Sequence, residues 1–246
     1  MAFTTATPFA SREVLNLVIT DYATGKPLAN LNYANTTSTE LTGEAVHAYG
    51  GWGHPKKVSF TGEKSGTFTV ETQLFTFELY RIVSGGEISK TASFIKRVEI
   101  AATEAGKLTL TTAPTGTPNV FALEDDCGTE IKGSWAQAVF TATTADEIAE
   151  GKTYVVYYLE NLADKVTRLS ITQNSSPKAV KMYGDTVVKT ENEELIPYKM
   201  VVYKATPQLN FSIANSNNGD PISLTMTFDL AADKDGNMVD LLLIEE

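Results

Sequence analysis

The chain has 246 residues, of which 42% are hydrophobic, and carries 20 basic and 30 acidic side chains for a formal net charge of −10. This length and this hydrophobic content suit one elaborate β-domain or two small ones around a buried core, and they argue against disorder. The net negative charge argues against a protein that binds nucleic acid through its phosphates and against docking on anionic lipid.

Short runs that mix Val, Ile, Thr, Tyr and Phe with period-two alternation dominate the chain and predict β-strands. In chain order, the predicted strands are 14–20, 57–60, 66–70, 96–101, 107–112, 120–123, 138–143, 153–159, 167–172, 178–183, 199–204, 209–214, 222–230 and 238–244. The segment 222–230 is apolar at every second residue and polar between them, which is typical of a half-buried strand.

Two segments have helical features instead. Residues 72–83 repeat apolar side chains at helical spacing, with Thr72 as the predicted N-cap and Gly85 or Gly86 as the left-handed stop. A second, short helix is predicted over 144–150, because two acidic residues fall in its first turn, where the helix dipole favours negative charge. The stretch 111–118, TTAPTGTP, predicts a boundary or a long exposed loop.

The sequence carries no recognised catalytic motif. DKDGN at 233–237 has its glycine in the fourth position and not in the sixth that a calcium loop needs, so a β-turn is favoured. The histidines, His47 and His54, and the one cysteine, Cys127, lack the spacing of a zinc site. Paired carboxylates could still meet in space, although no pair is singled out. We expect no enzyme activity, no cofactor, no metal site and no membrane span.

The segment 48–55, AYGGWGHP, concentrates three glycines and two aromatic residues. Glycine permits positive φ and close backbone approach, and exposed aromatic side chains anchor protein interfaces. Two interpretations stay open. Either the segment is a subunit interface with Tyr49, Trp52 and His54 as its candidate residues, or it is an aromatic loop buried within the monomer.

Three longer stretches share a pattern with one known family. Residues 47–86 run from a Gly-rich turn through strands to a single helix, and residues 183–214 and 218–245 form a closing part with the elements K-A-x-x-Q-x-N-F, G-D-P and D-K-x-G-N-M. The residues of these elements are Lys204, Ala205, Gln208, Asn210, Phe211, Gly219, Asp220, Pro221, Asp233, Lys234, Gly236, Asn237 and Met238. In these stretches, about half of the chain, the sequence resembles bacteriophage tail tube proteins, the major tail protein family.

The resemblance implies a mainly β fold, namely a β-sandwich or β-barrel subunit with one flanking α-helix and long β-hairpins. Residues 1–101 and 176–246 would form this core. Residues 102–175 match less clearly, so we expect a β-rich insertion or an extra subdomain there. The N-terminal residues 2–11, which have little apolar content, are expected to be mobile in a monomer and ordered against a neighbouring subunit.

The resemblance also implies function and partners. Subunits would form hexameric rings, and stacked rings would form a tail tube whose lumen is one continuous β-barrel that phage DNA passes without specific binding. Further partners would be sheath, tape measure or terminator proteins, and the protein would be made in the host cytoplasm and reside in the virion. A capsid decoration protein or another Ig-like virion protein is the alternative, and a carbohydrate-binding or hydrolytic β-sandwich is a more distant one.

Overall fold

The computed structural model describes residues 8–215, 217, 219 and 221–244. It is mainly β, with 58% strand and 6% helix, which confirms the predicted fold class. The chain divides into two compact units, one running up to Glu87 and resuming at Leu169, the other spanning residues 88–168. The limits expected for the inserted segment, 102 and 175, lie further along the chain than these. The earlier start has a reason in strand pairing. The strand β6 (Glu87–Ala101) pairs with a strand of the second unit and therefore belongs almost wholly to that unit.

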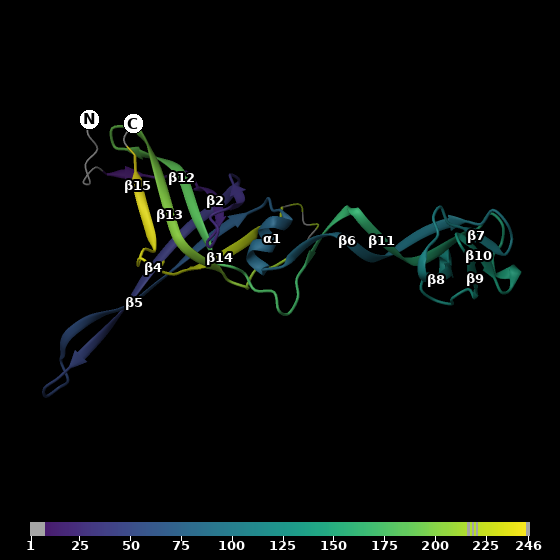
Figure 1. Ribbon diagram of the computed structural model, residues 1–246, viewed down its shortest axis with the longest axis horizontal. Helices are drawn as coiled ribbons and strands as arrows, with labels where there is room; N and C mark the ends of the chain where they lie inside the picture. Colours follow the sequence, from purple (N-terminus) through teal and green to yellow (C-terminus); the bar gives the residue numbers. More distant parts are fainter. Residues whose placement is uncertain (1–7, 216, 218, 220, 245–246) are drawn as a thin grey trace. The chain divides into compact units, whose positions relative to one another are not determined.

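The first unit is built on a nine-stranded sheet among the described residues. Its strands are β1 (Phe9–Ala10), β2 (Asn16–Asp21), β3 (Pro27–Leu31), β4 (Ala34–Tyr49), β5 (Lys56–Thr72), β12 (Val180–Thr190), β13 (Leu195–Pro207), β14 (Leu224–Leu230) and β15 (Val239–Leu243). The strand order is β3-β2-β12-β13-β14-β5-β4 (Figure 1), with β1 paired to β12 and β15 paired to β13.

This sheet has to curl back on itself. Its path runs from β3 at one end to β4 at the other, yet only Asn32 and Tyr33 connect these two strands. The backbone N–H of Leu15, just before β2, also donates to the hydroxyl of Thr37 on β4 (3.3 Å). The two ends of the sheet therefore meet at this corner, as in the sandwich or barrel that the resemblance implies.

The core of the first unit lies inside the curl. On β14, Leu224, Met226, Phe228 and Leu230 are buried and the residues between them are not, which confirms the predicted alternation. They meet buried residues of the paired strand β5 and of β2, β3, β12 and β13, among them Phe68, Val70, Leu17, Ile19, Leu31, Met182 and Val202. One face of each strand thus forms a single hydrophobic core.

One α-helix occurs among the described residues, α1 (Phe77–Ser84). The hydroxyl of Thr76 accepts a hydrogen bond from the backbone N–H of Leu79 (3.3 Å), and Gly85 ends the helix at φ 67°. Gly85 is one of the two predicted stops, and a Cβ there would come within 2.2 Å of the Ser176 backbone. The predicted N-cap, Thr72, is wrong. Thr72 is the last residue of β5, where pairing with β4 and β14 on its two sides holds it in the sheet and overrides the helical spacing.

The second unit is a small β-sandwich. Its strands are β6, β7 (Lys107–Thr109), β8 (Thr115–Ala122), β9 (Gly133–Ala136), β10 (Val139–Ala142) and β11 (Thr153–Ser170). They form the three-stranded sheets β7-β10-β9 and β6-β11-β8, whose shared core contains Leu108, Val120, Phe140, Ile148 and Val156.

Short 3₁₀ helices, η1 (Leu123–Asp125) and η2 (Ala145–Glu147), complete the second unit. The helix predicted at 144–150 is therefore only the single turn η2. The stretch 111–118 lies inside this unit, since β8 begins at Thr115, so it is not the boundary between the units.

At the N-terminus, residues 1–7 lie outside the described residues, and with them most of the segment that was expected to be mobile. Phe9 and Ala10 pair with Thr190 and Lys189 of the same chain. The mobility of the segment in a monomer stays a prediction. Within the described part of the chain, no helix is long and apolar enough to cross a membrane.

Candidate assembly interface

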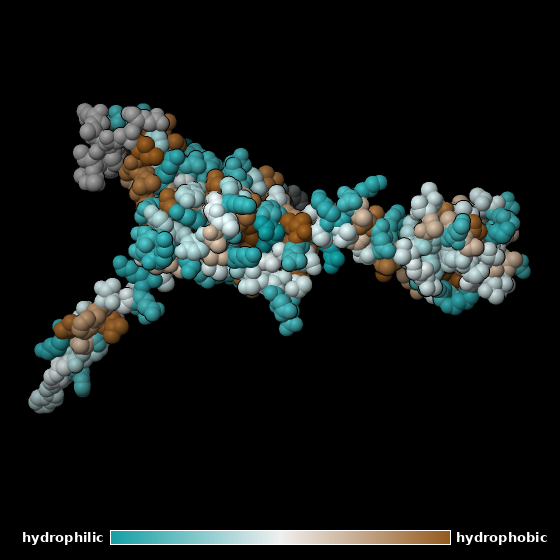
Figure 2. All heavy atoms as spheres, in the orientation of Figure 1, coloured by the Kyte–Doolittle hydropathy of each residue, from teal (hydrophilic) through white to brown (hydrophobic). Residues whose placement is uncertain are grey.

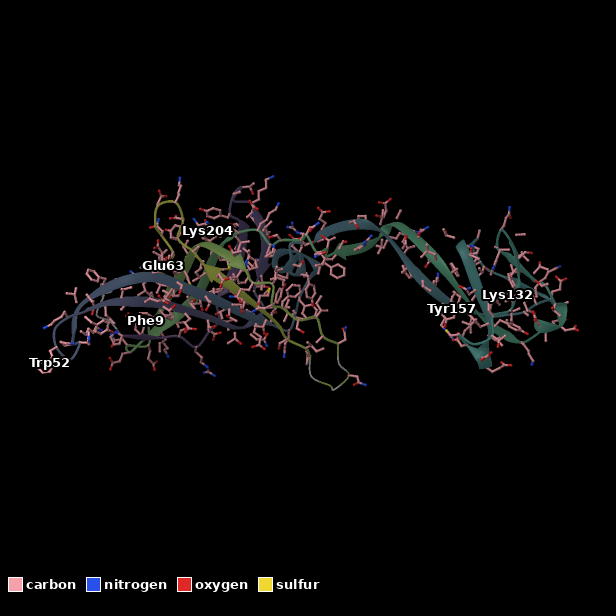
Figure 3. The ribbon with its side chains drawn as sticks, turned by 90° about the horizontal axis from the view of Figure 1, so that it is seen from below. Phe9, Trp52, Glu63, Lys132, Tyr157 and Lys204 are labelled. Carbon is pink, nitrogen blue, oxygen red and sulfur yellow. The ribbon has the colours of Figure 1, made fainter. Side chains whose placement is uncertain are left out.

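The strands β4 and β5 form a hairpin whose outer part projects from the sheet. β5 pairs with β14 only over residues 66–72, whereas its pairing with β4 continues as far as Tyr49 and Lys56. We call residues 41–65 the arm (Figures 1 and 3). Among the described residues, the strands of the arm pair only with each other. The backbone hydrogen-bonding groups along their outer edges are therefore available to another strand.

One face of the arm is apolar. The register places Val46 opposite Phe60 and Ala48 opposite Val58, so these four side chains share a face. Val46, Val58 and Phe60 remain 60%, 48% and 58% exposed, and apolar side chains are visible on the arm in Figure 2. A two-stranded ribbon with an uncovered apolar face is marginally stable in water on its own. Covering this face with another protein surface would therefore be favourable.

The tip of the arm, residues 49–57, is held in shape by its backbone. Gly51 and Gly53 have φ of 86° and 81°, His54 has φ of 46°, and the backbone N–H of His54 donates to the carbonyl of Gly51 (3.2 Å). This turn places Trp52 at the end of the hairpin (Figure 3), where its side chain is fully exposed.

The three predicted interface residues therefore lie together at the tip. Tyr49 ends β4, Trp52 lies in the turn and His54 follows it, with the ring of Tyr49 in edge contact with His47. The exposure of Tyr49 and Trp52 excludes the alternative of an aromatic loop buried within the monomer. That these residues contact another subunit stays a prediction. Sequence reasoning missed Val46 and Phe60, because their common face depends on the register of the two strands.

The strand β15 borders the base of the arm. A groove of about 480 Å³ between them is lined by Leu41, Lys64, Met238 and Val239, among others. A second groove of about 480 Å³, which we call the β15 groove, opens between β4, the N-terminal segment and strands β12, β13 and β15. Its lining is largely apolar and includes Phe9, Leu15, Tyr198, Met200, Val239 and Leu241.

A side-chain contact fixes β15 on the sheet. The hydroxyl of Tyr203 on β13 donates to the carboxylate of Asp240 on β15 (2.6 Å), in addition to the backbone pairing of the two strands. This hydrogen bond raises the pKa of Tyr203, because the phenol must stay protonated to donate. β15, which lines both grooves through Val239, is thus held on β13 by backbone pairing and by this side-chain contact.

The second unit contains a polar network around Asp126. Arg97 donates to Asp126 (2.9 Å) and Glu99 (2.7 Å), and Tyr157 donates to Asp126 (2.9 Å). Hydrogen bonds with Cys127 and Asp126 raise the pKa of Tyr157 to about 12. Desolvation raises the pKa of Asp126, but its hydrogen bonds from Tyr157 and Arg97 outweigh this and lower it. An ionised carboxylate and a protonated phenol that satisfy each other form a structural contact.

The DKDGN segment forms the predicted turn. The carboxylate of Asp233 accepts hydrogen bonds from the backbone N–H groups of Asp235 (2.9 Å) and Asn237 (2.8 Å), and Gly236 has φ of 85°. Among the residues that the structure describes, no group of three or more His, Cys, Asp or Glu side chains is arranged to hold a metal ion.

A mainly β chain with a long, exposed hairpin and open strand edges is typical of subunits that complete their sheets with other copies. A family model described as the YomU/Tube protein family matches residues 10–244, nearly the whole chain, and the chain belongs to this family. The match confirms the resemblance to phage tail tube proteins, which are structural proteins. No curated protein matches the chain.

Proposed function

We propose that this tail tube protein assembles into hexameric rings that stack into the tube of a phage tail, the conduit for DNA ejection. The arm is the observation that carries this proposal. Its strand edges have no further partner among the described residues, and its apolar face is uncovered. Such edges are an aggregation liability in a monomer, but ring closure gives every edge a neighbour. Arms from all subunits would then line the lumen as one continuous β-barrel.

The charge of the protein suits a conduit. The chain as a whole carries 30 acidic against 20 basic residues, and this excess does not favour binding of DNA phosphates. Weak attraction lets a duplex slide through instead of being held. We propose that DNA is cargo and not a ligand, and that the protein has no enzyme activity and needs no cofactor.

The partners follow from the same proposal. Each subunit would contact copies of itself within a ring and between rings. In the virion tail, sheath, tape measure or terminator proteins would contact the outside, the lumen and the end of the tube. Synthesis in the host cytoplasm would precede this assembly.

Negative-stain microscopy of purified protein, together with sedimentation over a concentration series, tests the proposal. We expect rings or filaments whose amount rises steeply above a threshold concentration. A protein that stays monomeric at every concentration and forms no filament would overturn it. Trimers that bind a capsid shell would favour the decoration-protein alternative instead.

A further inference from the structure

The tip of the arm has an unusual charge for this chain. Between Glu44 and Glu63 the sequence contains no acidic residue, and it contains the cations Lys56 and Lys57 beside the two histidines. The chain as a whole carries a formal net charge of −10. Basic charge is therefore concentrated at the end of the arm, next to the fully exposed Trp52.

A surface of the opposite charge lies at the turn between β12 and β13. Residues 191–194 contain Glu191, Glu193 and Glu194, all exposed. The nearby cation Lys189 lies 3.7 Å from Glu193, which leaves Glu191 and Glu194 as the carboxylates most open to an external cation. Glu13 adds a further negative charge in the lining of the β15 groove.

The β15 groove adjoins this acidic turn. Thr186 and Val188 of β12 and Tyr198 of β13 line the groove, and the same two strands lead into the turn. Phe9 and Leu241 in its lining are 46% and 62% exposed, so the groove is an open apolar surface. A volume of about 480 Å³ is in the range of sites that hold aromatic ligands, and it has room for an indole ring.

We infer that the arm tip of one copy docks on the β15 groove of a second copy, with Trp52 in the groove and Lys56 and Lys57 against Glu191 and Glu194. This inference rests on the proposed function and identifies the surface that receives the arm. A basic, aromatic tip and an acidic, apolar groove match both in charge and in hydrophobicity.

The contact has to form between copies. Leu41 lines the groove at the base of the arm, and Tyr49 lies eight residues further along the same strand. At about 3.3 Å per residue, the tip is roughly 26 Å away from its own groove. Because donor and receiver are different surfaces, copies joined in this way continue head to tail, and they close into a ring when the rotation between them allows it.

A charge exchange tests the pairing on the full chain. Lys56→Glu with Lys57→Glu, and separately Glu191→Lys with Glu194→Lys, are each expected to raise the critical concentration for assembly at least tenfold. All four substitutions in one chain should restore it to within about threefold of the original. A matched control, Lys152→Glu with Lys165→Glu, changes the net charge by the same amount in the second unit. Its effect on the critical concentration should be the same with and without the Glu191→Lys and Glu194→Lys substitutions. Lack of rescue, or equal rescue in the control, overturns the inference.

Cross-linking gives a measurement that does not require rings. In a Cys127→Ser background, Gly50→Cys places a thiol beside the intact Trp52, and Leu195→Cys places one beside the acidic turn. Mixing the two variants under mild oxidation should give a disulfide-linked dimer. Gly50→Cys mixed with Ile95→Cys is the control and should give little disulfide-linked dimer.

The two measurements separate the two claims. If the original protein forms rings and neither rescue nor the cross-link appears, the docking inference fails and the proposed function stands. If the specific cross-link forms at high concentration but no ring or filament does, the proposed function fails and the docking inference stands.

Discussion

Phe60→Ala should weaken assembly and leave the monomer almost as stable as before. Phe60 is 58% exposed and shares the apolar face of the arm with Val46 and Val58. A phenylalanine offers about 150–250 Å² for burial, so roughly 90–150 Å² remains to be covered by a neighbour. At about 25 cal/mol per Å², this area is worth about 2–4 kcal/mol. That energy corresponds to roughly a 30- to 700-fold weaker association, as an upper limit, because alanine keeps its Cβ.

The assay is the critical concentration for assembly, measured by sedimentation, next to a urea titration of the monomer. Ser59→Ala is the matched control, since Ser59 is the adjacent residue and faces the other side of the arm. The control should change neither quantity. An unchanged critical concentration for Phe60→Ala would show that this face stays uncovered in the assembly. A loss of monomer stability well above about 1 kcal/mol would show that Phe60 belongs to the monomer core.

Other outcomes follow from the same structure. Leu79 is fully buried on the inner face of α1, so Leu79→Ala should cost the monomer about 2–5 kcal/mol in a urea titration, and a cost near zero would contradict this packing. Because its hydrogen bond to Asp240 raises the pKa of Tyr203, its contribution to stability is complete below the ordinary tyrosine pKa of about 10 and is lost as pH rises through the raised value. The urea midpoint should therefore fall at high pH more in the original protein than in Tyr203→Phe, and equal curves would refute the role of this contact. Replacing any single acidic residue, histidine or Cys127 by alanine should abolish no hydrolysis of glycans or phosphoesters, and an activity lost with one such substitution would refute the proposal that the protein is not an enzyme.

The elements that could be predicted from sequence are those whose packing partners lie within the same chain. β14 is buried on one face by its own chain, so alternate apolar residues mark it. The stop of α1 at Gly85 was predictable because only a residue tolerant of positive φ fits there, with the Ser176 backbone so close. In both cases the partner that imposes the pattern lies within the same chain.

The largest omission is β4. Its sequence, ANTTSTELTGEAVHAY, lacks the alternation of a half-buried strand, and no strand was predicted there. The structure gives the reason, since most of its residues are exposed on both faces. The start of α1 was misplaced for a related reason, since pairing on both sides of β5 holds Thr72 in the sheet. Neither pairing leaves a local signal in the sequence.

A strand edge that pairs with other copies in the assembly must not pair indiscriminately while the subunits are free. The arm carries Glu44, Glu63 and Lys64 nearer its base and Lys56 and Lys57 at its tip. Charged residues along a strand edge are a common means of preventing indiscriminate pairing. Two arms that met in parallel would bring like charges together, which is repulsive. A basic tip beside the acidic turn of another copy would instead bring opposite charges together. The same side chains can therefore oppose random aggregation of free subunits and select the ordered contact.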